Sequence, residues 1–320
     1  MAESSKHISD RLRNREELPT GFRDELDSLI KRSFPLPTSP ALTQNASELD
    51  RVGVELWNAA TNILRRNEDG QNRSDRPARA SPIGMLLRTF AFFLIDAAYH
   101  ATSRREKDAD QFMRNFKIAL KTCRLCLQVG ELELADKAIE RCSEHVAVCE
   151  IDSPIVRISD SGEDEHCAHR KAMVIEFYLY RMSRACKIDR FDMAEHHFNQ
   201  IPWDRLSGSQ DLSQKAADLF YEVGKLLVRG KTEDTAIVWF ERAISALDIC
   251  AQEHQSQDAT ELRLSVSSSL GRHYYHVDLR QKFADLLQSN VSLMRTILSR
   301  LNELVMSFTN SPSSMALASE

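Results

Sequence analysis

The chain has 320 residues, of which 42% are hydrophobic and 28% charged, so it is too apolar to be intrinsically disordered. Only 10 glycines and 9 prolines occur, which argues against the many turns of an all-β fold. A net charge of −5 gives no general attraction to nucleic acid or to an anionic membrane. Seven cysteines, an odd number, are typical of a protein from a reducing compartment.

The N-terminal region is polar. Residues 1–43 are predicted to be a largely disordered leader with one short helix over residues 22–34, which the prolines of PLPTSP end. The leader lacks the apolar core of a secretory signal. A longer helix is expected to begin at a cap on Asn45 or Ser47 and to run to about Arg66.

A polar loop over residues 67–82 precedes the most apolar run of the chain, MLLRTFAFFLIDAAY at residues 85–99. This run is shorter than a membrane span needs, and it contains Arg88 and Asp96. Both observations favour a helix buried in a protein core.

Three helical hairpins are predicted after this helix. The first covers residues 116–149 and turns at Gly130, since glycine adopts a positive φ at no steric cost. An acidic insert over residues 151–166 separates it from the second hairpin, over residues 175–202. The third covers residues 217–250, and further helical segments follow it.

Residues 217–250 give the clearest pattern in the chain. Small and aromatic residues recur at the positions typical of a tetratricopeptide repeat (TPR), which is about 34 residues long. Gly224 and Ala236 are expected to let the two helices approach closely. Such a hairpin cannot bury both of its apolar faces alone, so stacked neighbours must cover them. An ordinary helical hairpin is the alternative.

The corresponding alanines of the three hairpins are Ala135, Ala194 and Ala236, at separations of 59 and 42 residues. Both separations exceed one repeat. The predicted fold is therefore all-α, a TPR-like helical-hairpin repeat array (an α-solenoid) with degenerate repeats. It is expected to occupy residues 44–276, followed by a C-terminal helix and frayed tail over residues 277–320.

Two helical segments carry a resemblance to a known family. They are ELDRVGVELWNAATNILRR at residues 48–66 and LLRTFAFFLIDAAY at residues 86–99. With the first and third hairpins they resemble, over roughly residues 46–275, the N-terminal part of a meiosis-specific TPR-like family. This is the family of sporulation-specific protein twenty-two, also called Zip four, whose animal relative is testis-expressed protein eleven. Its members are much longer, so the chain is expected to be an N-terminal segment or a shortened gene product.

The resemblance implies a function. Members of the family are non-enzymatic scaffolds of meiotic prophase that promote crossover formation and synaptonemal complex assembly. They lie in the nucleus on meiotic chromosomes, and their partners are other meiotic recombination and chromosome-axis proteins. A generic TPR adaptor that binds short peptides, as a chaperone cofactor does, is the alternative, but such adaptors favour uniformly spaced repeats. A nucleic-acid-binding module is disfavoured by the acidic balance.

In a TPR-like array the concave surface, formed by the first helix of each hairpin, is the expected partner-binding site. Its side chains are predicted to include Lys117, Arg124, Lys187, Asp218, Tyr221, Lys225 and Arg229, with Leu120, Glu176, Leu179 and Val228 beside them. The lysines and arginines would give the surface a positive bias suited to an acidic partner peptide. Ordinary solvated helix faces are the alternative.

No pattern predicts catalysis, a cofactor, a metal or a small-molecule substrate. The sequence lacks a phosphate-binding glycine loop, a zinc-protease HExxH motif and a GxSxG nucleophile. Cys123 and Cys126 form a CxxC motif, but no second one exists, and a shared buried helix face is the better interpretation. His196 and His197 are interpreted as surface histidines. Serines in the acidic insert, Ser159 and Ser161, suggest a phosphorylation-tunable loop or simply a solvated one.

Overall fold

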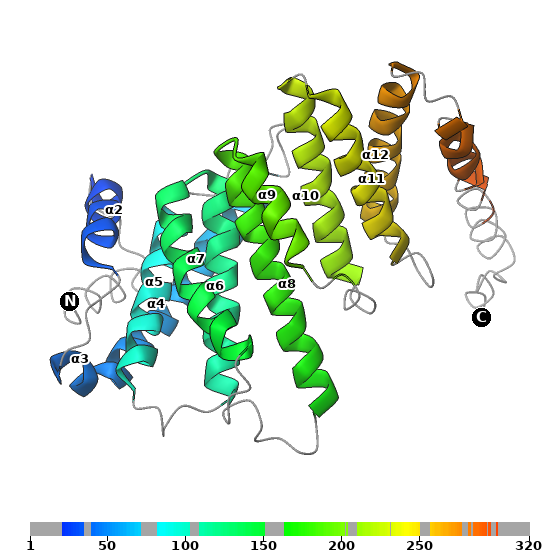
Figure 1. Ribbon diagram of the computed structural model, residues 1–320. Helices are drawn as coiled ribbons and strands as arrows, with labels where there is room; N and C mark the ends of the chain where they lie inside the picture. Colours follow the sequence, from blue (N-terminus) through cyan, green and yellow to red (C-terminus); the bar gives the residue numbers. More distant parts are fainter. Residues whose placement is uncertain are drawn as a thin grey trace, which may run out of the picture. The chain divides into compact units, whose positions relative to one another are not determined.

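The computed structural model describes residues 21–34, 40–71, 82–102, 109–150, 163–201, 203, 210–230, 232–249 and 257–276, and parts of the segment 281–299. Every regular element in these ranges is an α-helix (Figure 1), which confirms the all-α class. The chain divides into two compact units, Met1–Arg205 and Leu206–Glu320.

The first unit is built mainly of three helix pairs. They are α4 (Ala46–Gln71) with α5 (Pro82–Ala101), α6 (Ala109–Val129) with α7 (Leu132–Glu150), and α8 (Glu163–Lys187) with α9 (Phe191–Asn199). Helix α5 also contacts α6, and α8 contacts both α6 and α7, so neighbouring pairs pack against each other (Figure 1). The predicted helices are thus confirmed, while a regular TPR-type array stays a prediction.

The turn between α6 and α7 confirms the expectation for Gly130. Its φ is +89°, and its N–H donates to the carbonyl oxygen of Cys126 at 3.0 Å. The N–H of Glu131 donates to the same carbonyl at 3.0 Å, so the chain reverses while the last turn of α6 stays hydrogen-bonded.

Two helix boundaries differ from the predicted ones. The carbonyl of Asn45 accepts the N–H of Leu49 at 2.9 Å, so α4 begins at the predicted cap, but it continues past Arg66 to Gln71. Helix α8 begins at Glu163, inside the predicted acidic insert. Residues 151–162, with both serines of the insert, lie outside the described part of the chain.

Helix α2 (Phe22–Ser33) lies within the predicted leader but is packed into the core of the first unit. Leu26, Ile30 and Phe34 are buried against α5, and the Phe34 ring stacks on the Phe93 ring with centroids 5.1 Å apart. Lys137 on α7 donates from Nζ to the carbonyl oxygens of Lys31 (2.6 Å) and Phe34 (2.8 Å). These carbonyls end α2, so the lysine caps the helix where the backbone leaves acceptors unpaired. A short helix, α3 (Pro40–Gln44), leads into α4.

Helix α5 is the central helix of the first unit. Its segment Ile83–Ala101 is long and apolar enough to cross a membrane by length and composition alone, with a mean hydropathy of 1.2. However, 83% of the 18-residue stretch of this helix that meets the test is buried inside the protein. Contacts with α2, α4 and α6 therefore explain the apolar surface of α5. The prediction that this helix lies in a protein core is confirmed.

The second unit contains α10 (Gln210–Arg229), α11 (Glu233–Ile249) and α12 (Gln257–His276). Helix α11 packs against both of the others. A Cβ atom placed on Gly224 of α10 would lie 2.4 Å from Cε1 of the Phe240 ring on α11, so only glycine fits. Ala236 and Ala243 of α11 are fully buried. The predicted close approach of these two helices is confirmed.

Polar contacts connect α12, and the chain that follows it, to α11. Glu241 Oε1 accepts hydrogen bonds from the Tyr274 hydroxyl at 2.6 Å and from Lys282 Nζ at 2.7 Å. The described residues between 281 and 299 are helical.

Candidate functional site: the exposed face of the helix pairs

The seven residues predicted for a concave surface divide between the two units. Lys117 and Arg124 lie on α6, and Lys187 ends α8, all three exposed in the first unit. The other four, Asp218, Tyr221, Lys225 and Arg229, lie on α10 in the second unit. Leu120 and Leu179, predicted to lie beside them, are buried and contribute to packing instead.

On α10, two of the predicted residues have local structural roles. The Tyr221 hydroxyl lies 3.3 Å from Ser269 Oγ of α12, and its ring packs 5.8 Å from that of Phe240. Lys225 forms an ion pair with Glu222 and places Nζ 4.7 Å from the centre of the Tyr221 ring. The positive charge of Lys225 is therefore already balanced within its own helix.

On α6, three exposed cations lie along one line. They are Lys117, Lys121 and Arg124, hereafter the basic stripe. Spacings of four and three residues return to the same face of a helix, so the side chains follow one another at successive turns. Sequence reasoning selected Lys117 and Arg124 from repeat positions but missed Lys121, which the spacing of the charges alone could have identified.

Residues of α4 and α8 flank the basic stripe. Arg114 of α6 forms a two-pronged ion pair with Asp50 of α4, at 2.5 and 3.2 Å. On α8, the Tyr180 hydroxyl donates to Glu176 Oε1 at 2.6 Å. Burial and the Glu176 carboxylate raise the pKa of Tyr180, and the positive charge of Arg124 opposes this rise, so Arg124 lies near this pair.

The cysteines of the CxxC motif are core residues. Cys123 and Cys126 are buried on α6, and the Cys126 Sγ lies 3.5 Å from the Thr89 hydroxyl of α5. Burial raises the pKa of Cys126 to about 11 and raises that of Cys123 too, which disfavours the thiolate forms that bind metals. Among the described residues, no group of three or more His, Cys, Asp or Glu side chains is arranged to hold a metal ion.

The interpretation of both neighbouring histidines as surface residues is wrong for one of them. His196 is exposed, but His197 is only 4% exposed, and its Nδ1 lies 3.1 Å from Gln200 Oε1. Burial lowers the pKa of His197, which favours the neutral ring. The two rings point to different faces of α9 because adjacent helix positions are about 100° apart.

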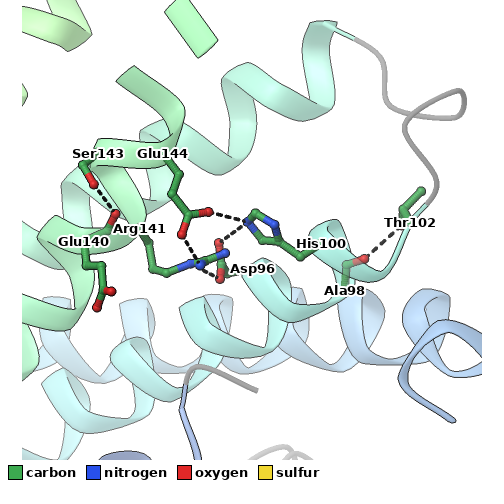
Figure 2. Close-up of polar contacts among 8 residues, drawn as sticks. All are labelled: Asp96, Ala98, His100, Thr102, Glu140, Arg141, Ser143 and Glu144. Atoms are coloured by element: carbon green, nitrogen blue, oxygen red, sulfur yellow. Dashed lines mark hydrogen bonds and ion pairs between the residues drawn. The ribbon is translucent and has the colours of Figure 1, made fainter. Parts of the chain in front are cut away.

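A charge cluster around the buried Asp96, between α5 and α7, was not predicted (Figure 2). Arg141 Nε donates to Asp96 Oδ2 at 2.7 Å, and Arg141 Nη1 donates to Glu144 Oε1 at 2.6 Å. His100 Nε2 lies 3.4 Å from the second oxygen of Asp96, and 3.7 Å from Glu144. The cluster joins two helices whose charged residues are far apart in the sequence.

Electrostatics explain why Asp96 stays ionised although its side chain is only 5% exposed. Burial acts to raise the pKa of this carboxyl, but His100, Arg141 and His145 outweigh it and hold the pKa below its usual value. The His145 ring is itself buried, and stacks on Phe116 with centroids 5.5 Å apart. The Arg141–Asp96 ion pair therefore links α7 to α5.

Comparison with known proteins finds a match to a family of meiosis proteins. Residues 184–309 match the family described as Meiosis protein SPO22/ZIP4 like, in agreement with the resemblance stated from the sequence, and the match indicates a meiotic role. The matched range begins in α8, includes α9 to α12 and continues beyond residue 275. It does not include the N-terminal segments 48–66 and 86–99. No match is found among curated proteins or solved structures.

Proposed function

We propose that the chain is a non-enzymatic protein-interaction scaffold in meiotic recombination, which promotes crossover formation and synaptonemal complex assembly. The single observation that carries this proposal is the match of residues 184–309 to the SPO22/ZIP4-like meiosis family. It stands beside the likeness of the N-terminal helices to the same family, which rests on different residues.

The architecture supports binding rather than chemistry. Helices stacked side by side present long exposed faces, while their opposite faces form the core. Several described ionisable groups with shifted pKa values, such as Asp96, Cys123 and Cys126, are buried inside helix packing. A catalytic acid, base or nucleophile must reach its substrate, and these groups do not.

The proposed partners are other meiotic recombination and chromosome-axis proteins, and the proposed location is the nucleus, on meiotic chromosomes. Binding to a membrane, a small molecule or nucleic acid directly forms no part of the proposal. The net charge of −5 supports the last point, because DNA binding without sequence recognition relies on positive charge.

A generic TPR adaptor of the chaperone-cofactor type is the competing function. It would bind short partner peptides in any cell type. The uneven separations of 59 and 42 residues between the corresponding alanines favour the meiotic scaffold, since peptide-reading TPR modules use uniform repeats.

Affinity purification tests the choice between them. The tagged chain is purified from meiotic cells and, at equal expression, from vegetative cells, and the recovered proteins are identified. The scaffold proposal expects recombination and chromosome-axis proteins in the meiotic sample alone. Recovery of chaperones from both samples, without meiotic proteins, would favour the adaptor and contradict the scaffold.

A further inference from the structure

The basic stripe on α6 has the features of a docking site for an acidic ligand. Lys117, Lys121 and Arg124 are all exposed, and at a rise of 1.5 Å per residue they extend over about 10 Å of the helix. Like charges at successive turns of one helix repel each other. A ligand of opposite charge relieves this repulsion and adds attraction of its own.

Two carboxylates near the stripe are engaged in other contacts. Asp50 is held by Arg114 at 2.5 Å, and Glu176 accepts the hydroxyl of Tyr180 at 2.6 Å. Asp110, in the first turn of α6, shares the exposed line but lies two turns before the first lysine. Within the described residues neither Lys117 nor Arg124 forms an ion pair, in contrast to Lys225 with Glu222.

We propose that the basic stripe binds an acidic segment of a partner protein, in which carboxylates recur every 5–7 Å. This inference rests on the proposed scaffold function and names the kind of partner segment that the first unit holds. Alternate residues of an extended peptide point the same way about 7 Å apart, and residues one helical turn apart lie about 5–6 Å apart. Both spacings can place one carboxylate opposite each cation.

A protein segment fits the stripe better than DNA does. Non-specific DNA binding needs several phosphate contacts spread over a surface. Here the cations lie on one helix of a chain with a net charge of −5, so the rest of the molecule repels a polyanion. A short acidic peptide contacts the stripe alone and avoids most of that repulsion.

Fluorescence anisotropy on the full chain tests the proposal. The probe is a fluorescein-labelled twelve-residue peptide of alternating glutamate and serine, and the same peptide with glutamine for glutamate is its neutral control. A labelled DNA duplex is measured in parallel. The variant carries Lys117→Glu, Lys121→Glu and Arg124→Glu. The matched control carries Arg23→Glu, Arg65→Glu and Arg272→Glu, three exposed cations outside the stripe and outside the predicted partner-binding residues, with the same change in net charge.

The proposal expects the acidic peptide to bind the unmodified chain and the neutral peptide to bind much more weakly. The stripe variant should lose at least about tenfold in affinity, as three exposed charge pairs predict. The matched control should change by less than about twofold. A milder variant carries glutamine at the three stripe positions and should also lose affinity. This variant keeps the test usable if charge reversal disturbs folding.

Several outcomes would overturn the proposal. They are absence of binding to the acidic peptide, equal losses in both triple variants, and tighter binding of DNA that is lost with the stripe. Failure here is distinct from failure of the scaffold function. If the stripe variant purifies the same meiotic proteins as the unmodified chain, the stripe proposal is wrong and the scaffold stands. If the unmodified chain recovers no meiotic protein, the scaffold itself fails.

Discussion

At the scale of single residues, the pair formed by Asp96 and Arg141 gives the sharpest prediction. Replacing Arg141 with methionine leaves a buried carboxylate without its nearest cation, so Arg141→Met should lower the free energy of unfolding by roughly 3–5 kcal/mol at pH 7. Urea denaturation followed by circular dichroism measures the loss. Arg51, exposed and paired with Glu48 and Glu55, is the control, and Arg51→Met should leave the free energy of unfolding almost unchanged.

The same variant has a predictable pH dependence. The folded-state pKa of Asp96 is depressed, so its carboxylate contributes stability above the unfolded value of about 3.9, and this contribution is lost as pH falls through the folded pKa. In Arg141→Met the nearest cation is gone, and protonation of Asp96 relieves the penalty. The difference between the two proteins should therefore shrink below about pH 4. A difference that stays constant from pH 7 to pH 3 would show that Asp96 is not the cause.

Single residues also show which features could be predicted from the sequence and which could not. A positive φ at Gly130 and the tight contact of Gly224 follow from local constraints, and both were predicted correctly. The pairing of Asp96 with Arg141 and the burial of His197 were missed. Periodicity tells which residues share a helix face, but it does not tell which helix will cover that face, so contacts across 45 residues leave no local signal.

At the scale of elements, the contact between α10 and α11 depends on the absence of a side chain at Gly224. The added Cβ of Gly224→Ala would lie 2.4 to 2.9 Å from three atoms of the Phe240 ring, which is itself buried beside Tyr221 and His273. Overpacking costs about 1–3 kcal/mol, whereas the gain in helix propensity is at most about 1 kcal/mol. We therefore expect net destabilisation of the second unit, measured as a lower urea midpoint.

Gly230→Ala is the matched control, since its added Cβ would meet only the carbonyl oxygens of Leu227 and Leu226, at 3.4 and 3.7 Å. These are ordinary contact distances, and the substitution should leave the midpoint unchanged or slightly raised. An unchanged midpoint for Gly224→Ala together with a lowered one for Gly230→Ala would contradict the packing described for this hairpin.

The order and type of the elements could be predicted from the sequence better than their docking. Apolar periodicity identified the helices from α4 to α11, and a turn residue located the reversal at Gly130. The packing of α2 into the core was not foreseen, because a twelve-residue amphipathic helix in a polar region gives no sign of the surface that receives it. Only the structure shows Lys137 capping its last carbonyls.

At the scale of the whole molecule, the chain divides into two compact units near residue 205, while the sequence had suggested one repeat domain over residues 44–276. The TPR-like pattern is strongest over residues 217–250, in the second unit. The family match covers all of that hairpin and begins in α8. The meiotic role indicated by the match therefore rests on the C-terminal part of the chain, and the scaffold function proposed here extends it to both units.

Counting meiotic crossovers tests the central claim most directly. The gene is deleted in its own organism, and crossovers per meiosis are counted by marker segregation, with chromosome synapsis scored in the same cells. The scaffold account predicts a marked fall in crossovers and incomplete synapsis, while vegetative growth stays normal. Normal crossover numbers and full synapsis in cells that lack the protein would contradict it.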